Sequence, residues 1–171
     1  MNRILILFSL ALISTLTQST IVADTNSTVL EVRGDVEGPL QLSLTDLLAM
    51  PRTTVKAREK NGDEATFEGV ALSEVIQRSR PRLTEKCCGN VANTCVIVRA
   101  TDNYRVLFSL AEIEPDFTDR KIILVDRRDG KPLPESQGPL RLVVPGEKVH
   151  ARWVRQVKSL EIVHVGTDAK P

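Results

Sequence analysis

Short segments in which apolar and polar residues alternate, separated by turn residues, run through most of the chain. The segment VLEVRGDV at 29–36 alternates as a strand with one buried face does, and TTVKARE at 53–59 is rich in β-branched residues. The turn NGDE at 61–64 separates the latter from a return strand at 65–70, because Asn and Gly tolerate a tight hairpin. The apolar segment at 121–126 is typical of a central strand. Further strands are predicted at 95–101, 104–108, 140–146 and 157–165.

Three short helices are predicted between these strands. Ser43 can cap a helix over 43–50, with Asp46 in its first turn to meet the helix dipole. The segment 71–79 places several apolar residues on one helical face and is stopped by Pro81. SLAE at 109–112 is a capping-box signature and opens the third helix. Eight or nine short strands with three short helices indicate an α+β domain.

The N-terminus has the pattern of a secretory signal peptide. Arg3 precedes an apolar segment at 4–16, and a polar stretch leads to Ala23, where cleavage is expected. We therefore expect a signal peptide at 1–23, a single domain at 24–171 and a periplasmic or secreted protein; an uncleaved anchor is the alternative. An apolar segment of ~13 residues is short for a transmembrane helix, and no later segment predicts a stable membrane span in the mature chain.

The charge of the chain is nearly balanced. It has 23 Lys and Arg against 22 Asp and Glu, and loss of Arg3 with the signal peptide leaves 22 against 22. A neutral total argues against a nucleic-acid partner or an anionic membrane surface. It leaves room for a local site for a small anion.

All three cysteines lie in one segment, TEKCCGNVANTC at 84–95. A structural zinc site usually needs four Cys or His ligands in paired spacing, and this segment offers three cysteines. In an exported protein a disulfide from Cys87 or Cys88 to Cys95 is favoured, and we take Cys88 with Cys95 as the predicted pair. The two histidines, His150 and His164, have no triad motif around them, so no catalytic residue is predicted.

A basic segment at 138–162 is the main candidate site. Gly146 frees the backbone for close approach to a ligand, and Trp153 is either a stacking surface or a core anchor. Guanidinium groups and backbone donors in such a loop suit a phosphate or another oxyanion; a solvated basic face is the alternative. The candidate contacts are Arg141, Lys148, His150, Arg152 and Arg155, with Lys158 further along, and Glu147 is the one acid between Arg141 and Lys158.

Four segments together resemble one family: FEGVALSEVI (67–76), ATDNYRVLFSLAEI (100–113), ILVDRRDGKPLP (123–134) and GPLRLVVPGEKVHARWVRQVKSLEI (138–162). Over about residues 29–163 the chain resembles the oxidoreductase molybdopterin-binding domain, the catalytic domain of sulfite oxidases and of the periplasmic methionine-sulfoxide reductase. The resemblance implies mixed β-sheets with few helices and a molybdenum–pyranopterin cofactor. The metal would bind one cysteine thiolate, and the basic segment would hold the pterin phosphate.

The resemblance places the metal-binding cysteine near Ala57, where this chain has no cysteine. CCGN at 87–90 is similar to the run around that cysteine in sulfite oxidases, but it follows the 67–76 segment instead of preceding it. Two functions therefore remain open. One is oxygen-atom transfer by a molybdopterin oxidoreductase, which would have a redox partner. The other is a non-catalytic module without the cofactor, which binds an anion or a protein partner through the basic segment.

Overall fold

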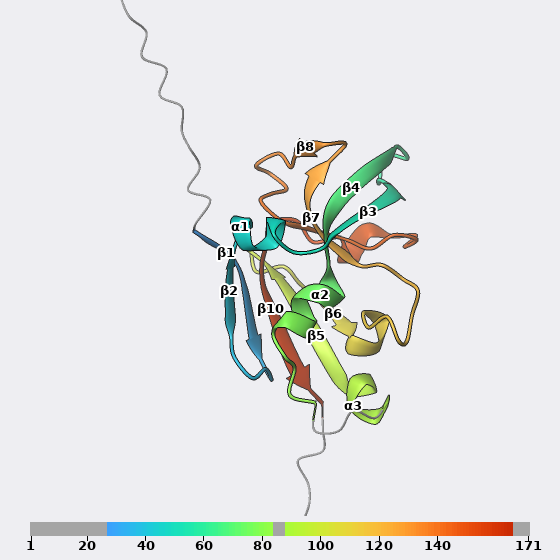
Figure 1. The fold of residues 1–171 in the computed structure, drawn as a ribbon. Coiled ribbons are helices and arrows are strands. Elements are labelled where there is room, and N and C mark those ends of the chain that lie inside the picture. The colour runs from blue at the N-terminus through green and yellow to red at the C-terminus, as the bar shows by residue number, and fades with distance from the viewer. Residues whose placement is uncertain (1–26, 84–87, 166–171) are drawn as a thin grey trace, which may run out of the picture.

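The computed structural model describes residues 27–83 and 88–165, whose strands form two sheets around one hydrophobic core (Figure 1). The first sheet has the order β2-β1-β10-β5-β6. Its strands are β1 (Thr28–Gly34), β2 (Leu40–Ser43), β5 (Thr94–Ala100), β6 (Arg105–Ser109) and β10 (Val157–His164). The second sheet has the order β3-β4-β7-β8, and β9 also pairs with β7. Its strands are β3 (Arg52–Arg58), β4 (Glu64–Ala71), β7 (Ile123–Arg128), β8 (Lys131–Pro132) and β9 (Arg141–Val143). The pair β1–β10 is parallel, whereas the others are antiparallel.

Short helices connect the strands. The α-helices are α1 (Leu44–Leu48), α2 (Leu72–Arg78) and α3 (Cys88–Ala92), and the 3-10 helices are η1 (Leu110–Glu112) and η2 (His150–Arg152). In Figure 1, α2 lies in front of the first sheet, and α3 lies at the lower end of that sheet. No described helix is long and apolar enough to cross a membrane.

The predicted capping of α1 is confirmed. The backbone N–H of Asp46 donates to Oγ of Ser43 (3.2 Å), and the backbone N–H of Ser43 donates to Oδ2 of Asp46 (2.8 Å). This reciprocal arrangement satisfies donors that the first turn would leave unpaired. It fixes where β2 ends and α1 begins.

The α+β fold class with mixed sheets and few short helices is confirmed. The predicted and observed elements differ only locally. The third predicted helix is only the 3-10 turn η1, since Pro115 disfavours helical backbone at Glu114. Three elements were not predicted: β8, which has two residues, the 3-10 helix η2, and α3, which lies in the cysteine segment that we expected to be a loop. The predicted signal peptide at 1–23 lies outside the described residues.

Candidate functional site

A cleft lies where the turn between β3 and β4 meets the coil that follows β9. It consists of two neighbouring cavities of about 660 Å³ and about 650 Å³. Both are lined by Glu59 and Lys60 from the turn and by His150 and Ala151 from η2. Figure 1 shows the β3–β4 turn beside the orange-red segment that holds η2. These two cavities together are termed the cleft.

Hydrogen bonds fix both walls of the cleft. In the turn, the N–H of Glu59 donates to the carbonyl of Asp63 (2.7 Å), and Gly62 has the positive φ of +93° that a side chain would strain. On the opposite wall, the Tyr104 hydroxyl donates to the carbonyl of Ala151 (2.6 Å) and thereby ties η2 to the loop after β5. The indole N–H of Trp153 donates to the carbonyl of Val144 (2.9 Å), which confirms the core-anchor alternative for this tryptophan.

Arg141 lines the cleft from β9, although its side chain is only 6% exposed. Its Nη1 donates to Oε1 of Glu59 (2.8 Å) and to Oε1 of Gln137 (2.7 Å). The guanidinium carbon lies 5.6 Å from the ring centroid of Phe67 and 5.3 Å from that of Trp153, within the range of a cation–π contact. The inner wall of the cleft therefore holds a buried positive charge between two aromatic rings.

Glu59 is shared between two arginines. Its Oε1 accepts from Arg141, and its Oε2 lies 3.2 Å from Nη1 of Arg128 on β7. Burial lowers the pKa of Arg141, the hydrogen bond with Glu59 opposes this shift, and the positive charges of Arg155 and Arg128 lower the pKa further. Three positive charges, on Arg141, Arg128 and Arg155, therefore lie close together around the carboxylate of Glu59.

Arg152 lies beside the cleft and lines neither cavity. Its Nε donates to Oε1 of Glu147 (2.7 Å), its Nη1 donates to Oε2 of Glu112 (3.0 Å), and its guanidinium lies 4.5 Å from the ring centroid of Phe108. Burial opposes the shift, but the hydrogen bonds with Glu112 and Glu147 raise the pKa of Arg152. Its charge is thus neutralised within the fold, where it joins η1 to the coil after β9.

Other basic side chains of the cleft have no such partner. Among the described residues, the exposed cations that line the cleft without an ion pair are Arg58, Lys60, Lys148 and Arg155. Asp102 is the acidic lining residue without a cationic partner in that same part of the chain, and it accepts the backbone N–H of Tyr104 (2.9 Å). The resulting excess of positive charge favours an anion.

Four of the five predicted contact residues line the cleft: Arg141, Lys148, His150 and Arg155. The ring of His150 lies 4.1 Å from that of Trp153, so it covers the tryptophan at the cleft wall. Sequence reasoning missed Arg58 and Lys60. These two cations stand just before the NGDE turn, and that position could have drawn attention to them. The sequence does not show, however, that this turn folds against the basic segment.

Comparison with known proteins identifies the family. The sequence matches the oxidoreductase molybdopterin binding domain over residues 17–169, and the chain belongs to this family. Among solved structures it is similar to the sulfane dehydrogenase SoxCD from Paracoccus pantotrophus, with 23% sequence identity and a TM-score of 0.65. That match covers 83% of this chain but 39% of the other, so this chain spans well under half of the dehydrogenase chain. No curated protein matches the sequence.

The side chains of the cleft do not fit a thiolate-bound molybdenum. Ala57, where the resemblance places the metal ligand, lies on β3, is 7% exposed and has no donor atom in its side chain. Within 27–83 and 88–165, no three or more His, Cys, Asp or Glu side chains are grouped to hold a metal. The cations of the cleft do fit the other expected part of the cofactor, a phosphate group.

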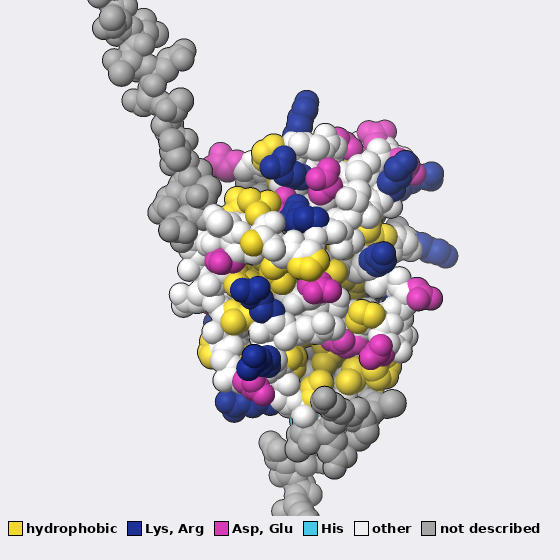
Figure 2. Space-filling model, viewed as in Figure 1, with side chains coloured by type: hydrophobic (Ala, Val, Ile, Leu, Met, Phe, Trp, Pro, Cys, Tyr) yellow, Lys and Arg dark blue, Asp and Glu magenta, His cyan; other side chains and the backbone are white. Residues whose placement is uncertain are grey.

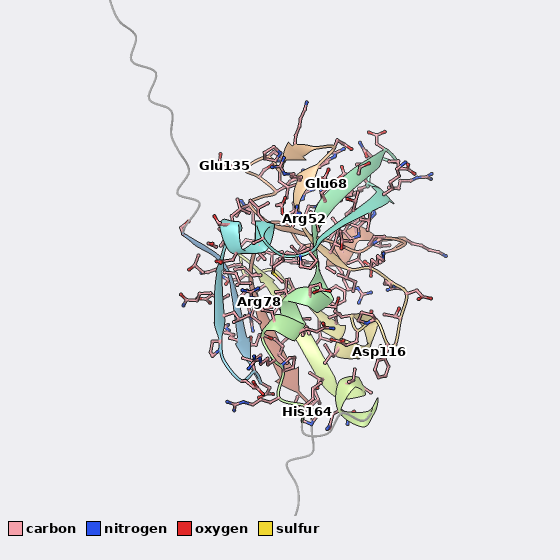
Figure 3. The ribbon with its side chains drawn as sticks, viewed as in Figure 1. Arg52, Glu68, Arg78, Asp116, Glu135 and His164 are labelled. Atoms are coloured by element: carbon pink, nitrogen blue, oxygen red, sulfur yellow. The ribbon has the colours of Figure 1, made fainter. Side chains whose placement is uncertain are left out.

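The described cysteine positions lie at the other end of the first sheet. Ala100 lines the cleft, whereas Cys95 is five residues earlier on β5, or about 17 Å away at ~3.3 Å per residue. Figure 1 shows α3, which begins at Cys88, far from the β3–β4 turn, and Figure 3 labels His164, the last residue of β10, at this same end. Cys95 has a free thiol in the structure. Cys87 and the side chain of Cys88 are outside the described part, so the Cys88–Cys95 disulfide stays a prediction.

Proposed function

We propose that this chain is an exported, non-redox member of its family that binds a phosphate-bearing small molecule in the cleft. The observation that carries the proposal is a set of four cations that form no ion pair with any described residue and surround a buried arginine: Arg58, Lys60, Lys148 and Arg155 around Arg141. Guanidinium and ammonium groups bind phosphate through charge-assisted hydrogen bonds. A cysteine thiolate, which oxygen-atom transfer at molybdenum would need, has no place among these lining residues.

The size of the cleft indicates a ligand with a body in addition to its anionic group. Each cavity alone falls within the range of pockets that hold drug-sized molecules, roughly 300–1,000 Å³. The lining includes Val149, Ala151 and Trp153, which offer apolar surface next to the cations. A pterin phosphate is one ligand of this class, and a nucleotide is another.

Export rests on the leader pattern at 1–23, which predicts a periplasmic or secreted protein. Oxygen-atom transfer at a molybdenum–pyranopterin cofactor is the second candidate function, and family membership favours it. It would require a thiolate from Cys87 or Cys88, because Ala57 has none. A protein partner docked on the same cations is a further alternative.

The first experiment measures how much molybdenum and pterin the purified protein contains. The full chain is expressed in a host that makes molybdenum cofactor, purified from the exported fraction, and assayed by elemental mass spectrometry and pterin fluorescence. We expect less than a tenth of a molybdenum per chain. A value near one molybdenum per chain would overturn the non-redox proposal and direct mutation to Cys87 and Cys88.

The second experiment locates the anion. Pyrophosphate is titrated calorimetrically into the wild type, into K60Q/K148Q/R155Q, and into R78Q/R82Q/K121Q, which removes the same charge from exposed positions that neither line the cleft nor neighbour its lining residues. We expect the cleft variant to lose at least tenfold in affinity and the control to lose less than threefold, because long-range charge effects are screened by salt. Equal losses in both variants, or no binding to the wild type, would contradict a ligand site in the cleft.

A further inference from the structure

Arg141 has more hydrogen-bond donors than the fold uses. A guanidinium carries five N–H groups, and the two acceptors of Arg141 among the described residues, on Glu59 and Gln137, both bind Nη1. Its Nε is buried without an acceptor among the described residues, and no hydrogen bond from Nη2 is formed within that part of the chain. A buried donor without an acceptor, such as this Nε, is costly, and here it lies on a side chain that is only 6% exposed and lines the cleft.

Glu59 is bound as an anionic ligand would be. Its side chain is 14% exposed, and its two oxygens face different arginines, Oε1 facing Arg141 at 2.8 Å and Oε2 facing Arg128 at 3.2 Å. A carboxylate between two guanidinium groups has the geometry by which proteins bind carboxylate and phosphate ligands. Glu59 directly follows β3, in a turn whose backbone hydrogen bonds among the described residues are short-range, from Glu59 to Asp63 and from Gly62 to Glu59.

The charges around this carboxylate do not balance. Arg141, Arg128 and Arg155 contribute three positive charges, and Glu59 contributes one negative charge. Asp129 lies 3.4 Å from Nε of Arg128, but its side chain is 56% exposed and screened by water. The region around Arg141 therefore stays positive with Glu59 in place, and it becomes more so if the Glu59 charge is removed.

We propose that Glu59 is a built-in competitor for an oxyanion: its carboxylate occupies the position on Arg141 and Arg128 where the phosphate or carboxylate group of a ligand binds. This inference rests on the proposed function, and it deepens it by naming the innermost anion position of the cleft. Ligands that reach this position displace the Glu59 side chain. The exposed cations Lys60, Lys148 and Arg155 attract the ligand before that exchange.

The test removes the competing charge. Glu59→Gln keeps the shape of the side chain, and Glu64→Gln removes one charge from an exposed residue of the same hairpin that does not line the cleft. Pyrophosphate is titrated calorimetrically into both variants and the wild type. We expect Glu59→Gln to bind at least tenfold more tightly than the wild type and Glu64→Gln to bind within threefold of it.

A stability readout accompanies the affinity. In buffer that contains only chloride, we expect Glu59→Gln to melt at a lower temperature than the wild type, because two arginines lose their shared carboxylate. Added pyrophosphate restores the melting temperature of Glu59→Gln more than it raises that of the wild type, since a ligand that binds the native state stabilises it. If Glu59→Gln does not fold, Glu59→Asp keeps the charge but shortens its reach, and an intermediate gain in affinity is expected.

The outcomes separate the two proposals. If the wild type binds pyrophosphate through Lys60, Lys148 and Arg155 but neither Glu59 variant binds it more tightly, the competitor role of Glu59 is overturned while the proposed function stands. An equal gain in Glu64→Gln would also overturn it, because the effect would then be general electrostatics. If no variant and no wild-type protein binds pyrophosphate, both proposals fail.

Discussion

Arg141 carries a full positive charge in a place that is almost closed to water. Its side chain is held by Glu59 and Gln137 and lies between Phe67 and Trp153, so both its charge and its stem have packed partners. Taking an ion out of water costs several kcal/mol, and only well-placed partners offset this cost. The pairing with Glu59 therefore matters to folding as well as to the cleft.

Replacement of Arg141 tests this at the scale of one residue. Arg141→Met keeps an unbranched stem but leaves Glu59 with Arg128 as its one partner, and breaking a buried pair costs about 3 kcal/mol or more. We expect a loss of that size in the free energy of unfolding, measured by urea denaturation. Arg155→Met, on an exposed cation of the same segment, should cost less than about 0.5 kcal/mol. Similar losses in the two variants would show that the Arg141–Glu59 pair contributes no more stability than an exposed cation does.

The candidate site shows which residues a sequence can and cannot assign. A dense basic segment predicted Arg141, Lys148, His150 and Arg155, because charge along the chain is visible directly. The same pattern included Arg152, but its guanidinium pairs with the carboxylate of Glu112, 40 positions earlier in the chain. The position of Glu59 between Arg141 and Arg128 depends on pairing across 82 positions, and no local pattern carries that information.

At the scale of elements, the α1 capping box predicts an acid-sensitive helix. The hydrogen bonds from the side chain and then the backbone of Ser43 lower the pKa of Asp46 below its ordinary value of 3.8. Because the folded pKa is the lower one, the stabilisation is complete above the ordinary value and is lost as pH falls through the folded pKa. We expect the wild type to be more stable than Asp46→Asn at about pH 6 and the difference to shrink as pH falls below the ordinary value of 3.8 in urea denaturation.

The control for that prediction removes the donor. In a Ser43→Ala background the side-chain hydrogen bond to Asp46 is gone, so the pH-dependent difference made by Asp46→Asn should shrink. A difference of the same size in both backgrounds would mean that the carboxylate acts through some other contact. The test is local, since α1 is only five residues long.

The pairing of β4 with β7 depends on a residue without a side chain. A Cβ placed on Gly69 would overlap the carbonyl oxygen of Leu124 and the Cα of Val125, both backbone atoms that cannot rotate away. We expect Gly69→Ala to cost more than about 3 kcal/mol or to prevent folding, as judged by urea denaturation and circular dichroism. Gly38→Ala is the control, because no atom lies within 4 Å of its Cβ position, and its stability should change by less than about 0.5 kcal/mol.

Strands were easier to predict than helices, for a physical reason. A strand such as β5 alternates buried and half-buried residues along its whole length, and this period of two is visible in a few residues. The helices have five to seven residues, less than two turns, so a period of 3.6 hardly repeats. α3, with no polar cap that the sequence displays, was missed, and η1 was cut short before Pro115.

At the scale of the whole molecule, the balanced charge is distributed and the cleft is the exception. On the face shown in Figure 2, basic and acidic side chains are interspersed, which agrees with a total near zero. The basic excess of the cleft arises only where the β3–β4 turn and the coil after β9 meet. Chain topology, and not composition, therefore creates this local excess of positive charge.

The same topology separates the cysteines from the cleft, and this separation can be tested. Cys95→Ala acts at one end of β5, while Ala100 lines the cleft at the other end, about 17 Å away. We expect pyrophosphate affinity to stay within twofold of the wild type in calorimetry. If the predicted Cys88–Cys95 disulfide forms in the exported protein, Cys95→Ala should also lower the free energy of unfolding by about 2 to 3 kcal/mol, and a reductant should remove that difference.

The two measurements carry different conclusions. A loss of affinity in Cys95→Ala would mean that a cysteine communicates with the cleft, and it would revive a thiolate ligand for a cofactor bound there. An unchanged affinity with a reductant-sensitive stability would assign the cysteines to a structural role, as expected for an oxidising compartment. Affinity would then depend on Lys60, Lys148 and Arg155, and stability would depend on the far end of the first sheet. We expect affinity and stability to change independently in this way, because the effects of mutations at distant sites add without coupling.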